Sequence, residues 1–257
     1  MNSSMTRLSI INPWLPYLRP DSRASLRLFC FPYAGGNAVN FRAWADKLPS
    51  VIDVCPVELP GRGRRMTEPR YTNLLELVQT LLTTLRPYLD VPFAFFGHSM
   101  GATIAFELSR RLRGCHDLQP SHLFVSGRRA PHVPYKSRPT YDLPDAELLQ
   151  ELQQLNGTPK EVLENHELMQ LMLPLLRADF EMVQTYAYSP GPMLNSSITA
   201  FGGLEDTEER REGLEAWRYH TSGNFTLHMI AGNHFFLNMS QAVLLRLLAQ
   251  ELDQLLV

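Results

Sequence analysis

The sequence predicts an α/β protein with a mostly parallel central sheet and helices on both faces. Short apolar segments alternate along the chain with longer segments in which apolar residues recur at helical spacing. The short segments lack a regular polar alternation, which is typical of strands that are buried on both faces of a parallel sheet. A length of 257 residues fits one such unit, so we expect a single domain over residues 1–257.

The strands and helices are expected to follow one another in a regular order. Strands are expected at 27–34, 52–59, 92–98, 122–127, 198–203 and 225–231. Helices are expected at 37–48, about 73–89, about 100–113 and, after the last strand, about 240–256. The apolar face of the first helix carries Phe41, Trp44 and Leu48, and Thr72 or Asn73 can cap the second helix.

One long segment, about 131–190, interrupts this alternation. It contains several prolines, its two apolar stretches have helical spacing, and no part of it is typical of a strand. A helical insertion between two strands of a sheet can cover a site at the sheet edge. We therefore expect a helical lid over about 131–190 rather than a second domain.

Composition restricts the classes of partner. The formal net charge is −2, from 24 basic and 26 acidic residues, so no overall field favours nucleic acid or an anionic membrane. Three cysteines, Cys30, Cys55 and Cys115, give no disulfide framework, which favours a reducing compartment and a cytoplasmic protein. We expect neither a secretory signal nor a membrane span, because the apolar runs are short and interrupted by prolines.

The pattern G-x-S-x-G occurs at Gly97 to Gly101, directly after an expected strand and directly before an expected helix. This context is that of the nucleophile elbow in the α/β-hydrolase fold, where a sharp turn exposes the serine hydroxyl. Ser99 is therefore the candidate nucleophile. The Met100 backbone N–H, at the start of the helix, is a candidate donor to an oxyanion.

A serine nucleophile needs a histidine base and an acid that orients it, and in this fold they follow the serine in the order acid, histidine. His234 lies after the last expected strand and is the best placed of the eight histidines. Asp206, after the strand at 198–203, is the first candidate for the acid, with Glu205 and Glu208 as alternatives. Asp179 precedes that strand and therefore does not fit the order. His98 adjoins the nucleophile but is expected to be structural or to line a pocket.

A second oxyanion donor is expected from the loop after the first strand. The turn at Tyr33-Ala34-Gly35-Gly36 enters a helix, and the Ala34 backbone N–H is our candidate. A plain strand-to-helix turn would also favour two glycines. The predicted chemistry requires no metal and no cofactor.

Six segments together resemble one family, the type II thioesterases of nonribosomal peptide and polyketide synthesis. They are LFCFPYAGGNA at 28–38, VELPGRGRR at 57–65, FFGHSMGA at 95–102, FVSGRRAP at 124–131, the loop that ends at Asp206, and GNHFFL at 232–237. Tyr33 stands where the family commonly has His, and Asn233 where it commonly has Gly.

The resemblance implies a Ser99–Asp206–His234 triad, a helical lid, and substrates held as thioesters on the phosphopantetheine arm of acyl or peptidyl carrier proteins. We also expect a monomer. Two other functions stay open at this point: a small-molecule carboxylesterase or lipase with the same triad, and a catalytically silent scaffold. A basic edge for an acidic carrier protein could come from either of two groups, Arg62, Arg64 and Arg65, or Arg128 and Arg129.

Overall fold

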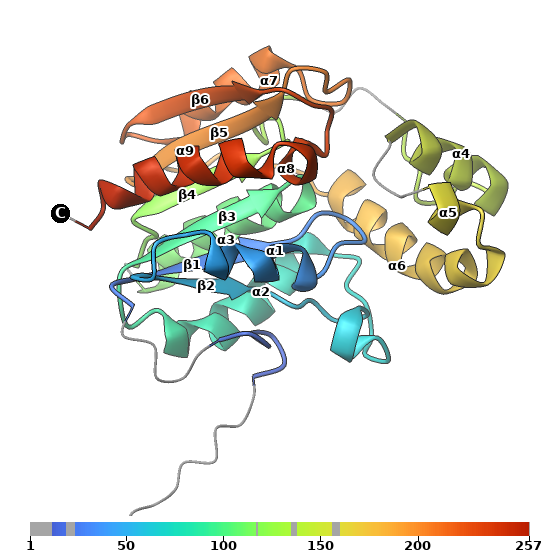
Figure 1. Ribbon diagram of the computed structural model, residues 1–257, viewed down its shortest axis with the longest axis horizontal. Coiled ribbons are helices and arrows are strands. Elements are labelled where there is room, and N and C mark those ends of the chain that lie inside the picture. Colours follow the sequence, from blue (N-terminus) through green and yellow to red (C-terminus); the bar gives the residue numbers. More distant parts are fainter. Residues whose placement is uncertain (1–11, 19–23, 117, 135–137, 156–159, 257) are drawn as a thin grey trace, which may run out of the picture.

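The protein is built around a six-stranded sheet in which all neighbouring strands are parallel (Figure 1). The computed structural model describes residues 12–18, 24–116, 118–134, 138–155 and 160–256. The strand order is β2-β1-β3-β4-β5-β6. The strands are β1 (Leu26–Phe31), β2 (Ile52–Pro56), β3 (Phe93–His98), β4 (His122–Ser126), β5 (Ser197–Gly203) and β6 (Phe225–Ile230).

Helices cover both faces of the sheet because alternate strand residues point to opposite sides. On one face, Phe29 and Phe95 belong to the core cluster that includes residues of α2 (Leu74–Leu85) and α3 (Met100–His116). On the other face, Leu28 and Phe96 pack with residues of α1 (Val39–Arg42) and α9 (Gln241–Asp253). The predicted architecture, a parallel sheet with helices on both faces, is thus confirmed.

The expected helices differ from the observed ones mainly at their ends. The segment at 37–48 is split into α1 and a 3₁₀ helix over Ala43–Asp46, which brings Trp44 to 4.8 Å from the Phe96 ring centroid. Helix α2 ends at Leu85, since Pro87 cannot continue its hydrogen bonds. Its cap is Asn73, whose side chain accepts from two backbone amides.

Several short helices were not expected, because segments this short carry no periodic signal. They are the 3₁₀ helix at Gly63–Arg65, α7 (Arg211–Glu215), the 3₁₀ helix at Ala216–His220, and α8 (Phe236–Met239).

The predicted helical insertion lies between β4 and β5. It contains α4 (Asp145–Leu155), α5 (Lys160–Leu163) and α6 (His166–Gln184). Figure 1 shows these helices beyond one end of the sheet, with α4 and α5 farthest from it. They share a small apolar cluster, whose buried members are Leu148, Leu152, Met169, Leu173 and Leu176. Met182, near the end of α6, packs into the main core and ties the insertion to the sheet.

All predicted site residues lie at the carboxyl ends of the strands. In a parallel sheet these ends meet along one edge, and ligands bind where the strand order reverses. Here the order reverses between β1 and β3, since the chain first adds β2 on one side and then β3 on the other. Ala34 and Ser99 follow these two neighbouring strands.

Two further observations concern the described residues as a whole. No helix among them is both long enough and apolar enough to cross a membrane. The three cysteines are free thiols, with Cys30 and Cys55 buried and Cys115 exposed.

A buried histidine in β4 links stability to pH. His122 stacks on Phe124 with ring centroids 4.2 Å apart, and its Nε2 lies 2.8 Å from the Thr199 hydroxyl oxygen. Burial lowers the pKa of His122 from 6.5 to about 4.

We therefore expect acid to destabilise the fold between about pH 6.5 and about pH 4, because the unfolded chain binds a proton that folded His122 does not bind. The loss from this residue is at most about 3.5 kcal/mol. Urea unfolding of wild type and His122→Gln at several pH values measures it. The variant should lose part of the pH slope only, since His220 has a pKa lowered to about 4 by burial. An unchanged slope would contradict the assignment.

Candidate active site

Ser99 occupies a one-residue bend between β3 and α3. The strand ends at His98 and the helix begins at Met100. Ser99 has a φ of 51°, and no other described residue except glycine has a positive φ. Its amide donates to the Ser126 carbonyl at 2.8 Å, which ties the bend to β4. Such backbone strain persists only where the surroundings enforce it, and it is common at functional sites.

The two glycines of the motif are required by close approach of the backbone. A Cβ atom at Gly97 would lie 2.1 Å from the carbonyl oxygen of Gly101. A Cβ atom at Gly101 would lie 2.1 Å from the carbonyl oxygen of Phe31, at the end of β1. The bend therefore brings the start of α3 directly against both β1 and β3.

His234 and Asp206 are in contact. The Nδ1 atom of His234 lies 2.8 Å from Oδ2 of Asp206, and the side chains are 11% and 0% exposed, respectively. The other oxygen, Oδ1, accepts from the amides of Glu208 at 2.9 Å and Glu209 at 3.1 Å. Because an ionised carboxylate only accepts, we assign the proton to Nδ1, which leaves the lone pair on Nε2. Of the three candidate acids, Asp206 is the one that the structure places against the ring.

The loop that carries Asp206 is held by a buried acid that sequence reasoning missed. Glu209 is 3% exposed, and its Oε2 accepts from both Nε of Arg129 at 2.8 Å and the Arg129 amide at 3.1 Å. Burial raises the pKa of Glu209, and Arg128 and Arg129 act in the opposite direction. The acidic run at 205–209 is the signal that could have pointed to it, but its pattern does not say which carboxylate is buried.

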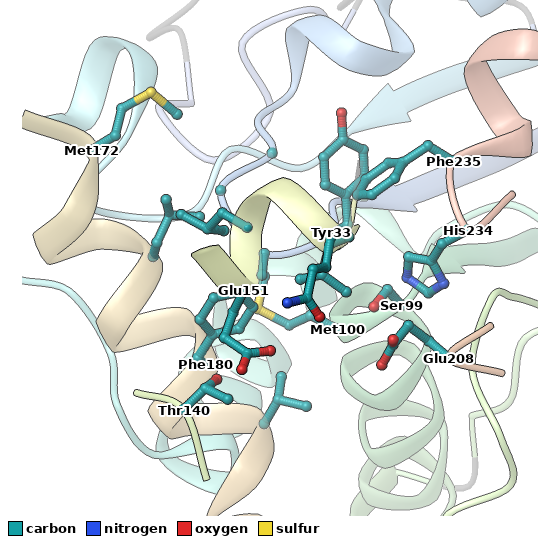
Figure 2. A pocket seen from close by; sticks show the side chains of 18 of the residues that line it. Tyr33, Ser99, Met100, Thr140, Glu151, Met172, Phe180, Glu208, His234 and Phe235 are labelled. Atoms are coloured by element: carbon teal, nitrogen blue, oxygen red, sulfur yellow. The ribbon is translucent and has the colours of Figure 1, made fainter. Parts of the chain in front are cut away.

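A cavity of about 570 Å³ opens over these residues. One wall comes from the loops at the carboxyl edge and includes Ala34, Ser99, Met100 and His234. The facing wall is mostly apolar and comes from α4, α5 and α6, with Leu152, Leu155, Val162, Leu168, Met172, Leu176, Phe180 and Val183. In Figure 2, Phe180 and Met172 lie across the cavity from Ser99 and His234, and the Ser99 side chain is beside the His234 ring.

Within the described part of the chain, the Ser99 hydroxyl makes no hydrogen bond to the His234 ring, although both line the cavity. Such contacts are often loose without substrate and tighten in the complex. Ala34 and Met100 also line the cavity, and among the described residues neither backbone amide donates a hydrogen bond. Both donors are therefore available to a bound oxyanion.

His98 packs against His234 and has a structural role. It is fully buried, its Nδ1 is 2.9 Å from the Ser126 hydroxyl oxygen, and its ring centroid is 5.2 Å from that of His234. Burial and the neighbouring His234 lower the pKa of His98 well below its usual value. A neutral, packed ring thus supports one side of His234.

The expectation of a basic edge at Arg62 and Arg65 is wrong. Arg62 is 4% exposed and pairs with Asp179, and Arg65 is 5% exposed and pairs with Glu68 while packing over the Trp14 ring. Buried guanidinium groups need such partners, so they cannot face a carrier protein. Arg64 is exposed. Arg128 and Arg129 both pair with the single carboxylate of Glu209, which offsets one of their two positive charges, and their side chains are 15% and 19% exposed.

Comparison with known families decides which family this geometry belongs to. A model of the thioesterase domain family matches residues 26–251. The chain belongs to the thioesterase domain family. The resemblance seen in the sequence is therefore confirmed, and the protein is a serine hydrolase of the thioesterase type.

Two relatives and two solved structures illustrate how much of the chain is similar to known proteins. Linear gramicidin dehydrogenase LgrE of Brevibacillus parabrevis is 47% identical over 247 residues, 95% of this chain and 94% of that protein. Gramicidin S biosynthesis protein GrsT of Aneurinibacillus migulanus is 44% identical over 248 residues, 96% of this chain and 97% of that protein. The name of LgrE states an activity that differs from the family.

The solved structures resemble this thioesterase along almost the whole chain. RedJ, a thioesterase from the prodiginine biosynthetic pathway in Streptomyces coelicolor, has a TM-score of 0.85 and 38% identity and covers 95% of this chain and 100% of its own. YbtT, a type II thioesterase from the yersiniabactin NRPS/PKS pathway, has a TM-score of 0.79 and 32% identity and covers 91% of this chain and 94% of its own.

The close approach at Gly101 makes a stability prediction. Gly101→Ala should destabilise the protein by about 3 kcal/mol or more, since its Cβ would overlap backbone that cannot move independently. Gly114 lies in the same helix with nothing within 4 Å of its Cβ position. Gly114→Ala is the matched control and should stabilise by about 0.5–1 kcal/mol. Urea unfolding compares them, and a mild effect at Gly101 would contradict the packing argument.

Proposed function

We propose that this protein is a stand-alone type II thioesterase of nonribosomal peptide or polyketide synthesis. Its substrates are acyl thioesters on the phosphopantetheine arm of acyl or peptidyl carrier proteins. The observation that carries the proposal is the strained Ser99, facing an apolar-walled cavity together with the His234–Asp206 pair. The carrier-bound substrate is inferred from relatives such as YbtT and GrsT.

In the proposed acylation step, Ser99 attacks the thioester carbonyl while Nε2 of His234 takes its proton. Asp206 orients the imidazole and stabilises its charged form through the 2.8 Å contact at Nδ1. The Ala34 and Met100 amides bind the oxyanion, and the Met100 amide adds the positive end of the α3 dipole. The pantetheine thiol, with a pKa near 8.5 like that of a cysteine, leaves with little need for a general acid.

In the proposed deacylation step, His234 activates a water molecule that attacks acyl-Ser99. The acyl group lies against the apolar wall formed by α4, α5 and α6, for which we propose the role of a lid. No metal or cofactor takes part in this cycle. We further propose that the protein acts in the cytoplasm, as a monomer and as one domain.

We expect Ser99→Ala to fold normally and to lose turnover by on the order of 10⁴-fold or more, because the nucleophile is removed. Asp206→Asn should lose a similar factor, because an amide favours the wrong tautomer of His234. Glu205→Gln is the matched control, since Glu205 is exposed and outside the contact with the ring, and it should keep wild-type rates. Thioester hydrolysis measures the turnover of each variant, and circular dichroism measures whether it folds. Turnover near wild type in Ser99→Ala would refute the mechanism.

Substrate class is tested by a panel of acyl-carrier proteins compared with the same acyl groups as free oxygen esters. We expect higher kcat/KM on the carrier thioesters; preference for free esters would favour a carboxylesterase or lipase. Failure of a serine-directed probe to label Ser99 would favour a silent scaffold.

The name of LgrE raises the possibility of dehydrogenase activity, which is tested by adding NAD(P)H and an aldehyde to this protein. We expect no oxidation of NAD(P)H. Neither Gly97–Gly101 nor the turn after β1 has the G-x-G-x-x-G spacing of a dinucleotide site.

A further inference from the structure

A buried ion pair joins the insertion to the loop after β2. Arg62 is 4% exposed and Asp179, on α6, is 1% exposed. The contact is bidentate: Nη2 of Arg62 lies 2.8 Å from Oδ1 of Asp179, and Nη1 lies 3.0 Å from Oδ2. A planar guanidinium and a carboxylate in this geometry orient each other strongly.

The same pair also holds the turn that contains Ala34. The Gly35 amide donates to Oδ2 of Asp179 at 2.7 Å, and Nη1 of Arg62 donates to the Gly36 carbonyl at 3.0 Å. Gly35 has a φ of +76°, and a Cβ there would lie 2.7 Å from a terminal methyl of Leu176 on α6. Two consecutive residues of the turn are thus fixed from outside by one ion pair and by one helix.

Stability alone does not explain these charges. Burying two ions costs most of what their attraction returns, and apolar residues of similar volume often stabilise a protein as well or better. An apolar pair, however, could not accept from the Gly35 amide or donate to the Gly36 carbonyl. What the charges add is therefore the orientation of the peptide groups next to Ala34.

We propose that Arg62 and Asp179 are positioning residues that hold the Ala34 amide toward the oxyanion formed at Ser99. The inference rests on the proposed function, since it assigns Ala34 its role there. Asp179 belongs to α6, the same helix that carries apolar side chains of the cavity wall. The ion pair therefore also fixes the acyl-binding wall relative to the oxyanion donors.

The test compares variants with different abilities to hold the turn. Arg62→Met/Asp179→Leu removes both charges of the pair at similar volume, so neither Arg62 nor Asp179 is left as an unpaired buried ion, and the buried Glu58 loses the favourable charge of Arg62. Asp179→Asn keeps an acceptor for the Gly35 amide and loses the charge. The matched control is Arg177→Met/Asp145→Leu, which removes an ion pair between α6 and α4 at 2.5 Å, with side chains 27% and 70% exposed.

The main readout is the second-order rate at which a fluorophosphonate probe labels Ser99. In that reaction the Ser99 oxygen bonds to phosphorus, fluoride leaves, the serine proton goes to His234, and negative charge develops where the oxyanion donors point. The rate therefore reports the donors whatever the natural acyl group is. Thermal unfolding, kcat and KM for a thioester, and inhibition by an alkyl boronic acid complete the set.

We expect Arg62→Met/Asp179→Leu to fold but to unfold at a lower temperature than wild type, because the Gly35 amide and the Gly36 carbonyl lose their partners. Labelling, kcat and boronic acid affinity should each fall by about 10²-fold, as after loss of one oxyanion donor. KM should change little. Asp179→Asn should lose a smaller factor, about 3- to 10-fold by the same reasoning, and the control should match wild type.

Wild-type labelling in both Asp179 variants would overturn the proposal, as would a loss confined to KM or an equal loss in the control. If the double variant does not fold, Asp179→Asn decides: reduced labelling supports the proposal, and wild-type labelling overturns it. Failure of the proposed function is distinguishable. In that case wild type would be labelled at Ser99 yet hydrolyse no carrier thioester.

Discussion

The close approach of α3 to β1 and β3 is the constraint on which the active site depends. With glycine at 97 and 101, the helix can begin one residue after the strand ends, and Ser99 is left in a conformation that only its surroundings can enforce. The same approach places the loop after β1 next to Ser99. The strained backbone of Ser99, the proposed nucleophile, and the nearness of the proposed oxyanion donor Ala34 are thus two consequences of one packing contact.

The other site loops are held by buried charges rather than by apolar packing. Glu209 and Arg129 hold the loop that carries Asp206, and Arg62 and Asp179 hold the turn that carries Ala34. Loops lie at the surface and have few apolar contacts, so charge-assisted hydrogen bonds are an effective way to define their geometry. Each buried charge has a partner of opposite charge, whose attraction offsets much of the cost of desolvation.

Most of the fold was predictable because its signals are local. Buried strands, helical spacing and the strand-bend-helix context of Ser99 are each written in a few consecutive residues. The ends of helices, the short helices and the burial of individual charges could not be predicted from the sequence. Arg62 was expected at the surface and Asp179 was set aside for its place in the chain order, yet the two meet 117 residues apart in sequence.

The sequence by itself determined the order of strands and helices, the insertion, and the candidates Ser99, Asp206 and His234, because the hydrolase order of these groups follows from chain position. Tertiary structure alone decided that Asp206, not Glu205 or Glu208, contacts His234, and that Arg62 and Arg65 are buried while Arg64 is exposed. The reason is physical: neighbouring carboxylates and arginines are chemically equivalent along the chain. Only packing distinguishes the one that is buried and paired from the one that is in water.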